Sequence, residues 1–384
     1  MELKEKVTRR EFLKRALAIG GAIAIGTFSF KRYFGHRKIE NYVDTLNLPK
    51  REARYYYGFG DDMVRCEVCP NMCILKNGEW GLCRSRQNIN GKLYSRVYGI
   101  PCAVHLDPIE KKPVFHFYPG SKAYSISTTG CNLRCKFCQN WQISQVKPNQ
   151  VNYINLPPSS VVANAKMSGA TSIAYTYGEP VAFYDYMLDT ATLAKSQGVK
   201  NVVITAGYIN EEPLKELAKV VDVIKVDLKG FNREYYRKIC SAERDEVLNA
   251  LKVMKKTGVW IEIVNLILPT LNDAKSEIES MSEWILDNLG KDVPLHFSRF
   301  FPMYKLKNLP PTPVETLEMA RKTAIDVGLN YVYIGNVPGH YGEDTYCPNC
   351  GNVLVDRNGY FIRAIHIKNG RCEYCGYKIA GVWK

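Results

Sequence analysis

Residues 123–138 read Ala-Tyr-Ser-Ile-Ser-Thr-Thr-Gly-Cys-Asn-Leu-Arg-Cys-Lys-Phe-Cys, a strand-like run followed at once by a loop with three cysteines. The run predicts a β-strand over 123–128, because it is short and rich in strand-forming residues. The loop then carries Cys131, Cys135 and Cys138 at the carboxyl end of that strand. This strand is the first of a series of predicted strands, and the three cysteines of the loop form one of three cysteine groups in the chain.

The stretch 123–335 alternates strand-like runs with amphipathic segments. Strands are predicted at 123–128, 171–176, 200–205, 223–228, 260–268, 294–299 and 331–335. Helices are predicted at 159–168, 181–197, 211–219, 243–257, 274–289 and 313–327, and three of them end before Gly198, Gly258 and Gly328. This alternation is typical of a parallel sheet with right-handed crossovers, either a barrel or an open doubly wound sheet. A complete barrel takes about 250 residues, so we predict an α/β fold with an incomplete (β/α) barrel.

The composition divides the chain into four predicted parts. These are an N-terminal segment (1–40), a turn-rich, Cys-rich module (41–120), the partial barrel (121–340) and a second Cys-bearing unit (341–384). With 46% hydrophobic and 23% charged residues, the chain is globular rather than disordered, collagenous or a multi-span membrane protein. Of the net charge of +14, residues 1–40 carry +6, which leaves a mild excess that disfavours nucleic acid as a partner.

The N-terminal segment resembles a twin-arginine export signal. It reads Thr-Arg-Arg-Glu-Phe-Leu-Lys at 8–14, followed by an apolar, Gly-rich run at 16–30. As a helix that run would be about 22 Å long, short of the roughly 30 Å hydrocarbon core of a bilayer. We therefore expect export or membrane association through residues 1–40, with a basic amphipathic arm on a cytoplasmic protein as the alternative.

Eleven of the thirteen cysteines fall into three groups. The groups are Cys66, Cys69, Cys73 and Cys83; Cys131, Cys135 and Cys138; and Cys347, Cys350, Cys372 and Cys375. Cys102 and Cys240 stand apart. Cysteines spaced two or three residues apart converge on metals, whereas disulfide scaffolds belong mostly to shorter secreted chains. The sequence therefore predicts three metal sites.

The middle group has the spacing C-x3-C-x2-C on a single loop. Its thiolates can ligate three irons of a 4Fe–4S cluster, and the loop has no fourth cysteine. One iron is then open to a small chelating molecule, whereas an electron carrier ligates every iron with protein. The alternatives are a zinc site with a distant fourth ligand and reduced structural thiols.

With Phe137 just before its last cysteine, the loop resembles the signature of radical S-adenosylmethionine (SAM) enzymes. The loop, Pro-Ile-Glu-Lys-Lys-Pro at 108–113, Tyr-Thr-Tyr-Gly-Glu-Pro at 175–180 and Cys-Pro-Asn-Cys-Gly at 347–351 are similar to the AmmeMemoRadiSam-system enzymes, relatives of pyruvate formate-lyase-activating enzyme. The resemblance runs from about residue 65 to 383. It implies a 4Fe–4S cluster on the three cysteines, with SAM on its open iron. It also implies reductive cleavage of SAM to methionine and a 5′-deoxyadenosyl radical, which abstracts hydrogen from a substrate.

The resemblance implies roles for other residues. Phe137 would lie beside the adenine, and Gly178 and Glu179 would meet the ammonium group of SAM. Asp227 and Lys229 would lie near its ribose and carboxylate. The alternative for Gly178 and Glu179 is an ordinary strand-to-helix turn.

The run at 223–229 carries a separate argument. Its strict alternation puts Lys225, Asp227 and Lys229 on one face of a strand. Helices cover the outside of a barrel, so this face should point inward; the alternative is a solvated edge strand. Further polar residues on or beside later strands are as easily structural as catalytic, and none is assigned a role. They are Glu262, Asn265, His296 and Arg299.

The two outer cysteine groups differ in how clearly they indicate a metal. In the C-terminal group, two C-x2-C-Gly knuckles predict a structural zinc ribbon, with an auxiliary iron–sulfur cluster as the alternative. In the N-terminal group, the four cysteines Cys66, Cys69, Cys73 and Cys83 predict either zinc or a second, fully ligated 4Fe–4S cluster that relays electrons. Their spacing does not decide between the two.

Together these features predict a radical SAM oxidoreductase that acts on an unidentified substrate. Its partners would be SAM and an electron donor such as ferredoxin or flavodoxin. One alternative is a glycyl-radical enzyme activating enzyme, whose substrate would be a backbone glycine of a partner protein. A non-catalytic iron–sulfur electron carrier or zinc-based interaction protein is the other alternative.

Overall fold

The computed structural model describes residues 48–383. The twin-arginine-like segment that we predicted at 1–40 lies outside these residues. None of the helices within 48–383 combines the length and the hydropathy that a bilayer crossing needs.

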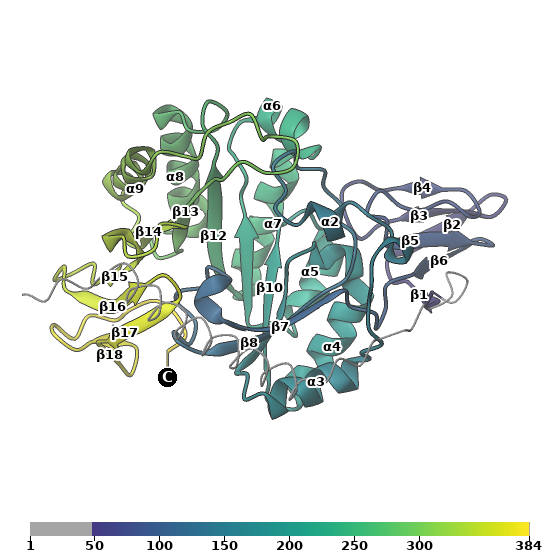
Figure 1. Ribbon diagram of the computed structural model, residues 1–384, viewed down its shortest axis with the longest axis horizontal. Coiled ribbons are helices and arrows are strands. Elements are labelled where there is room, and N and C mark those ends of the chain that lie inside the picture. The colour runs from purple at the N-terminus through teal and green to yellow at the C-terminus, as the bar shows by residue number, and fades with distance from the viewer. Residues whose placement is uncertain (1–47, 384) are drawn as a thin grey trace, which may run out of the picture. The chain divides into compact units, whose positions relative to one another are not determined.

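The centre of the molecule is an eight-stranded sheet in the order β14-β13-β12-β11-β10-β9-β8-β7 (Figure 1). The strands are β7 (Ala103–Pro108), β8 (Lys122–Ser127), β9 (Ser172–Tyr175), β10 (Lys200–Thr205), β11 (Val223–Asp227), β12 (Trp260–Ile267), β13 (Leu295–Arg299) and β14 (Val332–Gly335). β8 to β14 pair in parallel in chain order, and β7 pairs antiparallel with β8. A doubly wound sheet would reverse its strand order, so the predicted partial barrel is confirmed. The sheet also begins upstream of residue 121, where we placed the boundary.

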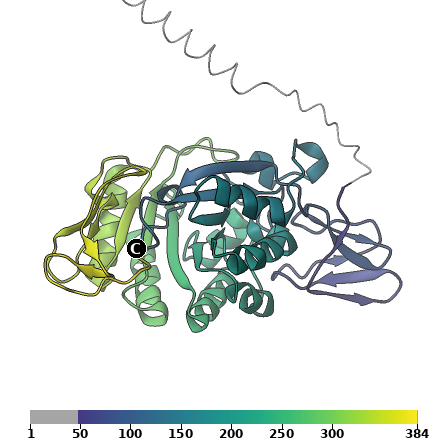
Figure 2. The same ribbon diagram turned by 90° about the horizontal axis from the view of Figure 1, so that it is seen from below.

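Helices connect the parallel strands and cover one face of the sheet (Figure 2). They are α3 (Pro158–Met167), α4 (Tyr184–Ser196), α5 (Glu211–Ala218), α7 (Arg244–Thr257), α8 (Lys275–Leu289) and α9 (Val314–Val327). α7 shows how they are fixed: it buries Val247, Leu251 and Met254, three to four residues apart, in the main hydrophobic core. All six helices were predicted. The segments α2 (Trp141–Ser144), α6 (Arg233–Tyr235) and η4 (Tyr236–Cys240) are too short to show a period and were not.

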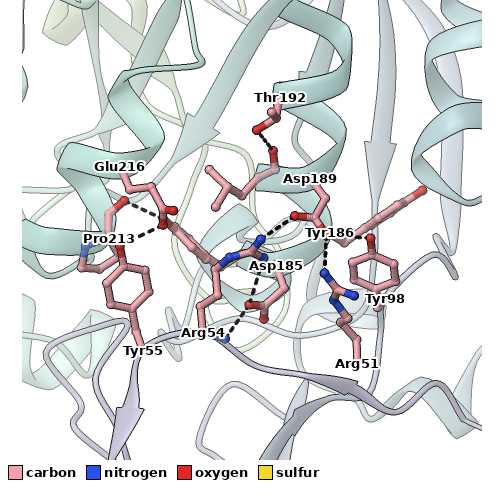
Figure 3. Close-up of polar contacts among 12 residues, drawn as sticks. Arg51, Arg54, Tyr55, Tyr98, Asp185, Tyr186, Asp189, Thr192, Pro213 and Glu216 are labelled. Atoms are coloured by element: carbon pink, nitrogen blue, oxygen red, sulfur yellow. Dashed lines mark hydrogen bonds and ion pairs between the residues drawn. The ribbon is translucent and has the colours of Figure 1, made fainter. Parts of the chain in front are cut away.

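The N-terminal module consists of two three-stranded antiparallel sheets. Its strands are β1 (Arg51–Glu52), β2 (Tyr56–Phe59), β3 (Met63–Cys66), β4 (Ile74–Leu75), β5 (Arg86–Ile89) and β6 (Lys92–Ser95). Polar contacts hold it to α4 (Figure 3). Asp189 accepts hydrogen bonds from Arg54 at 2.8 Å, from Tyr98 at 2.8 Å and from Arg51 at 3.2 Å. Asp185 accepts one from the Arg54 backbone N–H at 2.8 Å.

The C-terminal unit is built from β15 (Thr345–Tyr346), β16 (Val353–Asn358), β17 (Phe361–Ile365), β18 (Ile367–Lys368) and β19 (Arg371–Cys372). The chain then returns to the segment after β7, where Val382 donates to His116 O at 2.7 Å and accepts from Tyr118 N at 2.9 Å. Arg357 of β16 is buried and donates to Phe115 O at 3.1 Å. The unit therefore packs on residues 115–118, near the amino ends of the barrel strands.

A buried carboxylate, Glu262 of β12, organises this end of the barrel. It accepts hydrogen bonds from the backbone N–H of Phe115 at 2.9 Å and of His116 at 2.8 Å, and it lies 2.9 Å from His296 Nε2. Burial by itself would raise the pKa of Glu262, yet the His296 hydrogen bond and charge and the Phe115 amide bring it below its ordinary value. Glu262 therefore joins three segments that are distant in sequence.

We predict that Glu262→Gln destabilises the fold by about 2–4 kcal/mol, because the new amide NH₂ faces buried donors that need an acceptor. Because the pKa of Glu262 is lowered on folding, the difference from wild type should shrink as the pH falls below the ordinary value of 4.5. Thermal melts of both proteins between about pH 3 and pH 8 measure this. The matched control is Glu279→Gln on the exposed face of α8. Equal melting temperatures for the two variants at neutral pH would contradict the role given to Glu262.

Candidate functional site

A cavity of about 520 Å³ opens at the carboxyl ends of the barrel strands. Its walls include the ends of five neighbouring strands, with Thr176 after β9, Thr205 of β10, Asp227 of β11, Leu266 of β12 and Ser298 of β13. The volume lies within the roughly 300–1,000 Å³ range of small-molecule sites. In barrels of this kind the carboxyl ends of the strands carry the active site.

The three-cysteine loop forms one wall, and Cys131, Cys135, Cys138 and Phe137 all line the cavity. The Leu133 backbone N–H donates to Cys131 Sγ at 3.3 Å. Burial raises the pKa of the Cys131 and Cys138 thiols. A bound cation is what holds such buried thiols in the ionised form.

Gly178 and Glu179 also line the cavity, directly after β9. A Cβ at Gly178 would lie 2.9 Å from Ser127 Oγ and 3.1 Å from Thr128 O, so the turn packs too closely on β8 for a side chain. The Glu179 carboxylate accepts from Thr205 Oγ1 at 2.5 Å and from the Ala206 backbone N–H at 2.8 Å. Burial raises the pKa of Glu179 despite these donors. Glu179 therefore fixes the end of β10 against the cavity.

The charged face predicted for 223–229 lines the same cavity, with Lys225, Asp227 and Lys229 all in its wall. Asp227 forms ion pairs with both lysines, and the Lys229 ammonium lies 5.8 Å from the centre of the Phe137 ring. Burial would raise the pKa of Asp227, but the two lysines bring it below its ordinary value. This strand therefore supplies a fixed array of charges opposite the cysteines.

Sequence reasoning missed a second cationic group in the wall, Lys111 and Lys112. The Lys112 ammonium lies 2.6 Å from Asp107 Oδ2 and 4.4 Å from the centre of the Tyr177 ring. Burial lowers the pKa of Lys112 to about 8, although Asp107 opposes the shift. The run at 108–113 was noticed only as part of a resemblance. A buried lysine has no sequence signature of its own.

Cys240, which the sequence left as a spare thiol, lies buried behind the loop. Its backbone O accepts from Arg134 N at 2.9 Å, and a hydrogen bond from its thiol lowers the pKa of Cys135. It is absent from the residues that line the cavity in the described part of the chain. We therefore assign it to support of the loop.

The four unassigned polar residues of the later strands have structural partners. Glu262 and His296 form the buried pair at the amino ends of the strands. The Asn265 side chain donates to Leu228 O at 2.7 Å, and Arg299 Nε donates to Thr312 O at 2.8 Å. None of the four lines the described cavity.

The chemistry of the lining suits a thiolate-ligated cluster with SAM. Cys131, Cys135 and Cys138 are the cysteines among the described residues that line the cavity. Four lysines and two carboxylates line the cavity, and Asp107 pairs with Lys111 and Lys112 from outside the lining. The lysines still outnumber the carboxylates, so the wall favours an anionic cluster and the carboxylate of a bound amino acid. The residues present therefore fit both groups.

Comparison with known proteins agrees with this geometry. A family model described as the radical SAM superfamily matches residues 125–285. An uncharacterized protein of Methanocaldococcus jannaschii is 49% identical over 331 residues, which cover 86% of this chain and 98% of that protein. The pyruvate formate-lyase-activating enzyme of Staphylococcus epidermidis is 26% identical over 237 residues, which cover 57% of this chain and 92% of that enzyme.

Among solved structures, a radical SAM methyltransferase from Sphaerobacter thermophilus aligns with 59% of this chain and 71% of its own, at 17% identity and a TM-score of 0.45. The sequence matches carry the assignment. The chain belongs to the radical SAM superfamily of enzymes and is a relative, within it, of the pyruvate formate-lyase-activating enzymes.

Proposed function

We propose that Cys131, Cys135 and Cys138 bind a 4Fe–4S cluster whose open iron takes SAM, and that the enzyme abstracts hydrogen from a substrate not yet identified. A cluster held by these cysteines would supply the electron for reductive cleavage of SAM to methionine and a 5′-deoxyadenosyl radical. The observation that carries the proposal is the convergence of three cysteines and a fixed array of charges on one cavity at the carboxyl ends of the strands. The non-catalytic electron carrier that we considered from sequence loses its support, because the chain belongs to a superfamily of enzymes.

The residues of the chain would position SAM and limit its movement. We propose that Lys229, held by Asp227, attracts the carboxylate, and that Asp227 keeps acceptor capacity for the ribose. Phe137 offers a flat apolar surface for the adenine, and its ring is buried in the wall. The ammonium group of SAM would rest against the backbone at Gly178 and Glu179.

We predict that anoxically reconstituted enzyme, once reduced, releases 5′-deoxyadenosine from SAM, and that Cys135→Ala abolishes this release because the cluster loses a ligand. Liquid chromatography of the quenched reaction measures it. Cys102→Ala is the matched control, since Cys102 lies outside all three cysteine groups. Equal release from the Cys135→Ala and Cys102→Ala proteins would refute the assignment.

A glycyl-radical activating activity is the second candidate, and similarity to pyruvate formate-lyase-activating enzymes favours it. The substrate would then be a backbone glycine of a partner protein. If so, the enzyme with SAM should generate a stable, oxygen-sensitive radical on a co-purifying protein, visible by electron paramagnetic resonance. Turnover of a small molecule in the absence of any other protein would decide against this candidate.

We further propose that the C-terminal group binds structural zinc. Among the described residues, Cys347, Cys350, Cys372 and Cys375 form the one group of three or more candidate ligands whose atoms all lie within 4.8 Å of one another. The sulfurs of Cys347 and Cys375 are 3.6 Å apart, and those of Cys350 and Cys372 are 3.7 Å apart. Tetrahedral zinc with Zn–S bonds of about 2.3 Å requires sulfurs about 3.8 Å apart.

We predict one zinc ion per chain, lost in Cys350→Ser and retained in Cys102→Ala, because a closed zinc site needs all four thiolates. Metal analysis of the anoxically purified proteins measures it. Iron and sulfide that disappear with Cys350→Ser would instead identify the auxiliary cluster that we kept as the alternative.

The narrower placement among AmmeMemoRadiSam-system enzymes rests on the motifs quoted above and stays a prediction. So do the choice of ferredoxin or flavodoxin as electron donor and the export or membrane association of residues 1–40.

A further inference from the structure

The N-terminal cysteine group forms a second site beside the first. Its four members, Cys66, Cys69, Cys73 and Cys83, line one small enclosed cavity. They come from the end of β3, the turn that follows it and the loop before β5. The turn is closed by a hydrogen bond from Cys66 N to Cys73 O at 2.9 Å. The two small sheets thus bring together four cysteines that are spread over 18 residues.

The spacing of these sulfurs differs from that of the C-terminal group. Among the described residues, only the C-terminal group brings its sulfurs within 4.8 Å of one another, as a single zinc ion requires. The N-terminal group and the three-cysteine loop each surround a cavity without such convergence. A cubane cluster places iron and sulfide between its cysteine ligands, so its ligand sulfurs stand farther apart than those around one ion. The sulfur spacing of the N-terminal group therefore resembles that of the three-cysteine loop and differs from that of the C-terminal group.

A buried cation faces these sulfurs. Arg86 has a side-chain exposure of 1%, and its Nη1 lies 3.6 Å from Cys66 Sγ. Its ion pair with Asp185, at 2.8 Å, is shared, because Arg54 also lies 3.9 Å from that carboxylate. Arg86 Nε is buried and has no hydrogen-bond partner among the described residues. Arg86 thus shares its one carboxylate partner with Arg54 and places a cationic donor beside the sulfurs, which favours an anionic centre there. Hydrogen bonds to ligand sulfurs are also a means of tuning a cluster's potential.

The two cysteine sites share a wall. Cys131 N donates to Cys83 O at 3.2 Å, and Asn132 lines the N-terminal cavity while its neighbour Cys131 lines the main one. At Gly130, a Cβ would come within 2.4 Å of Cys83 O and 2.1 Å of Ser85 Oγ. The backbones of the two sites are therefore in direct contact, and this closeness favours electron transfer between clusters bound at the two sites.

The surface beside this wall is basic. Arg84 follows Cys83, Arg134 precedes Cys135, and both line a shallow hollow together with Lys147 and Trp80. Lys147 lies 5.1 Å above the Trp80 ring. The hollow contains one acidic residue, Glu79. Its charge suits an acidic carrier protein.

We propose that Cys66, Cys69, Cys73 and Cys83 bind a second 4Fe–4S cluster, ligated at every iron, which relays electrons to the cluster of the three-cysteine loop. The relay role rests on the proposed function, whereas the cluster itself does not. One electron leaves a reduced acidic carrier protein of the iron–sulfur or flavin type and reduces the N-terminal cluster. The same electron then passes to the loop cluster, which returns the N-terminal cluster to its oxidised state.

The test of the cluster uses the full-length chain with Cys131, Cys135 and Cys138 all replaced by alanine. After anoxic reconstitution we expect this variant to keep about four iron and four sulfide per chain, with a signal in electron paramagnetic resonance after reduction that added SAM does not alter. Wild type should hold about twice as much of each. Two zinc ions per chain and no iron in the variant would overturn the proposal, even if wild type still releases 5′-deoxyadenosine.

The test of the relay uses Cys69→Ser. We expect its loop cluster to assemble, which is measured as a SAM-dependent shift of the reduced signal. Release of 5′-deoxyadenosine driven by a reduced flavodoxin, divided by release driven by dithionite, should fall relative to wild type and to Cys102→Ala. An unchanged ratio would overturn the relay and leave the cluster standing. Absence of 5′-deoxyadenosine in wild type with both reductants would instead count against the proposed function.

Discussion

The contact between the three-cysteine loop and the N-terminal module constrains the whole site. At Gly130 the chain passes so close to Cys83 and Ser85 that no side chain can be accommodated, and Ser85 Oγ donates to Thr129 O at 2.9 Å. The loop is therefore fixed from two sides, by β8 below it and by the module beside it. A loop whose three cysteines are proposed to bind one cluster needs such support, because sulfurs on a flexible segment lose much conformational entropy when they converge.

The two ends of the barrel strands have different roles: contacts at the amino ends stabilise the fold, and the carboxyl ends line the cavity. Near the amino ends, Glu262 accepts buried amide hydrogen bonds and ties residues 115–116, on which the C-terminal unit packs, to the sheet. At the carboxyl ends, Asp227 and Lys229 are paired with each other inside a cavity. Charges at the amino ends are therefore balanced within the protein, whereas at the carboxyl ends the lysines of the cavity outnumber their carboxylate partners.

Much of this could be predicted from the sequence, for identifiable reasons. The barrel strands are short apolar runs between amphipathic helices, and the structure places them within about a residue of the expected positions. β7 was not predicted as a strand, because its six residues include exposed His105 and Leu106 and end in Pro108, a pattern typical of a linker. The roles of Lys112 and Cys240 were not predicted, because they come from burial against segments distant in sequence, which no local pattern encodes.

The three cysteine groups show where spacing along the chain stops being informative. All three contain a C-x2-C pair, and sequence alone left zinc and iron–sulfur clusters open for the two outer groups. What differs in the structure is the distance between sulfurs across each site, and this is set by how the flanking strands pack. The tail hairpins bring the four sulfurs together around a point. The N-terminal module and the three-cysteine loop each hold their sulfurs around a cavity. The Cys131–Asn132 peptide lies between these two cavities. Packing between elements, rather than the motif, is therefore what separates the proposed structural ion from the two proposed redox centres.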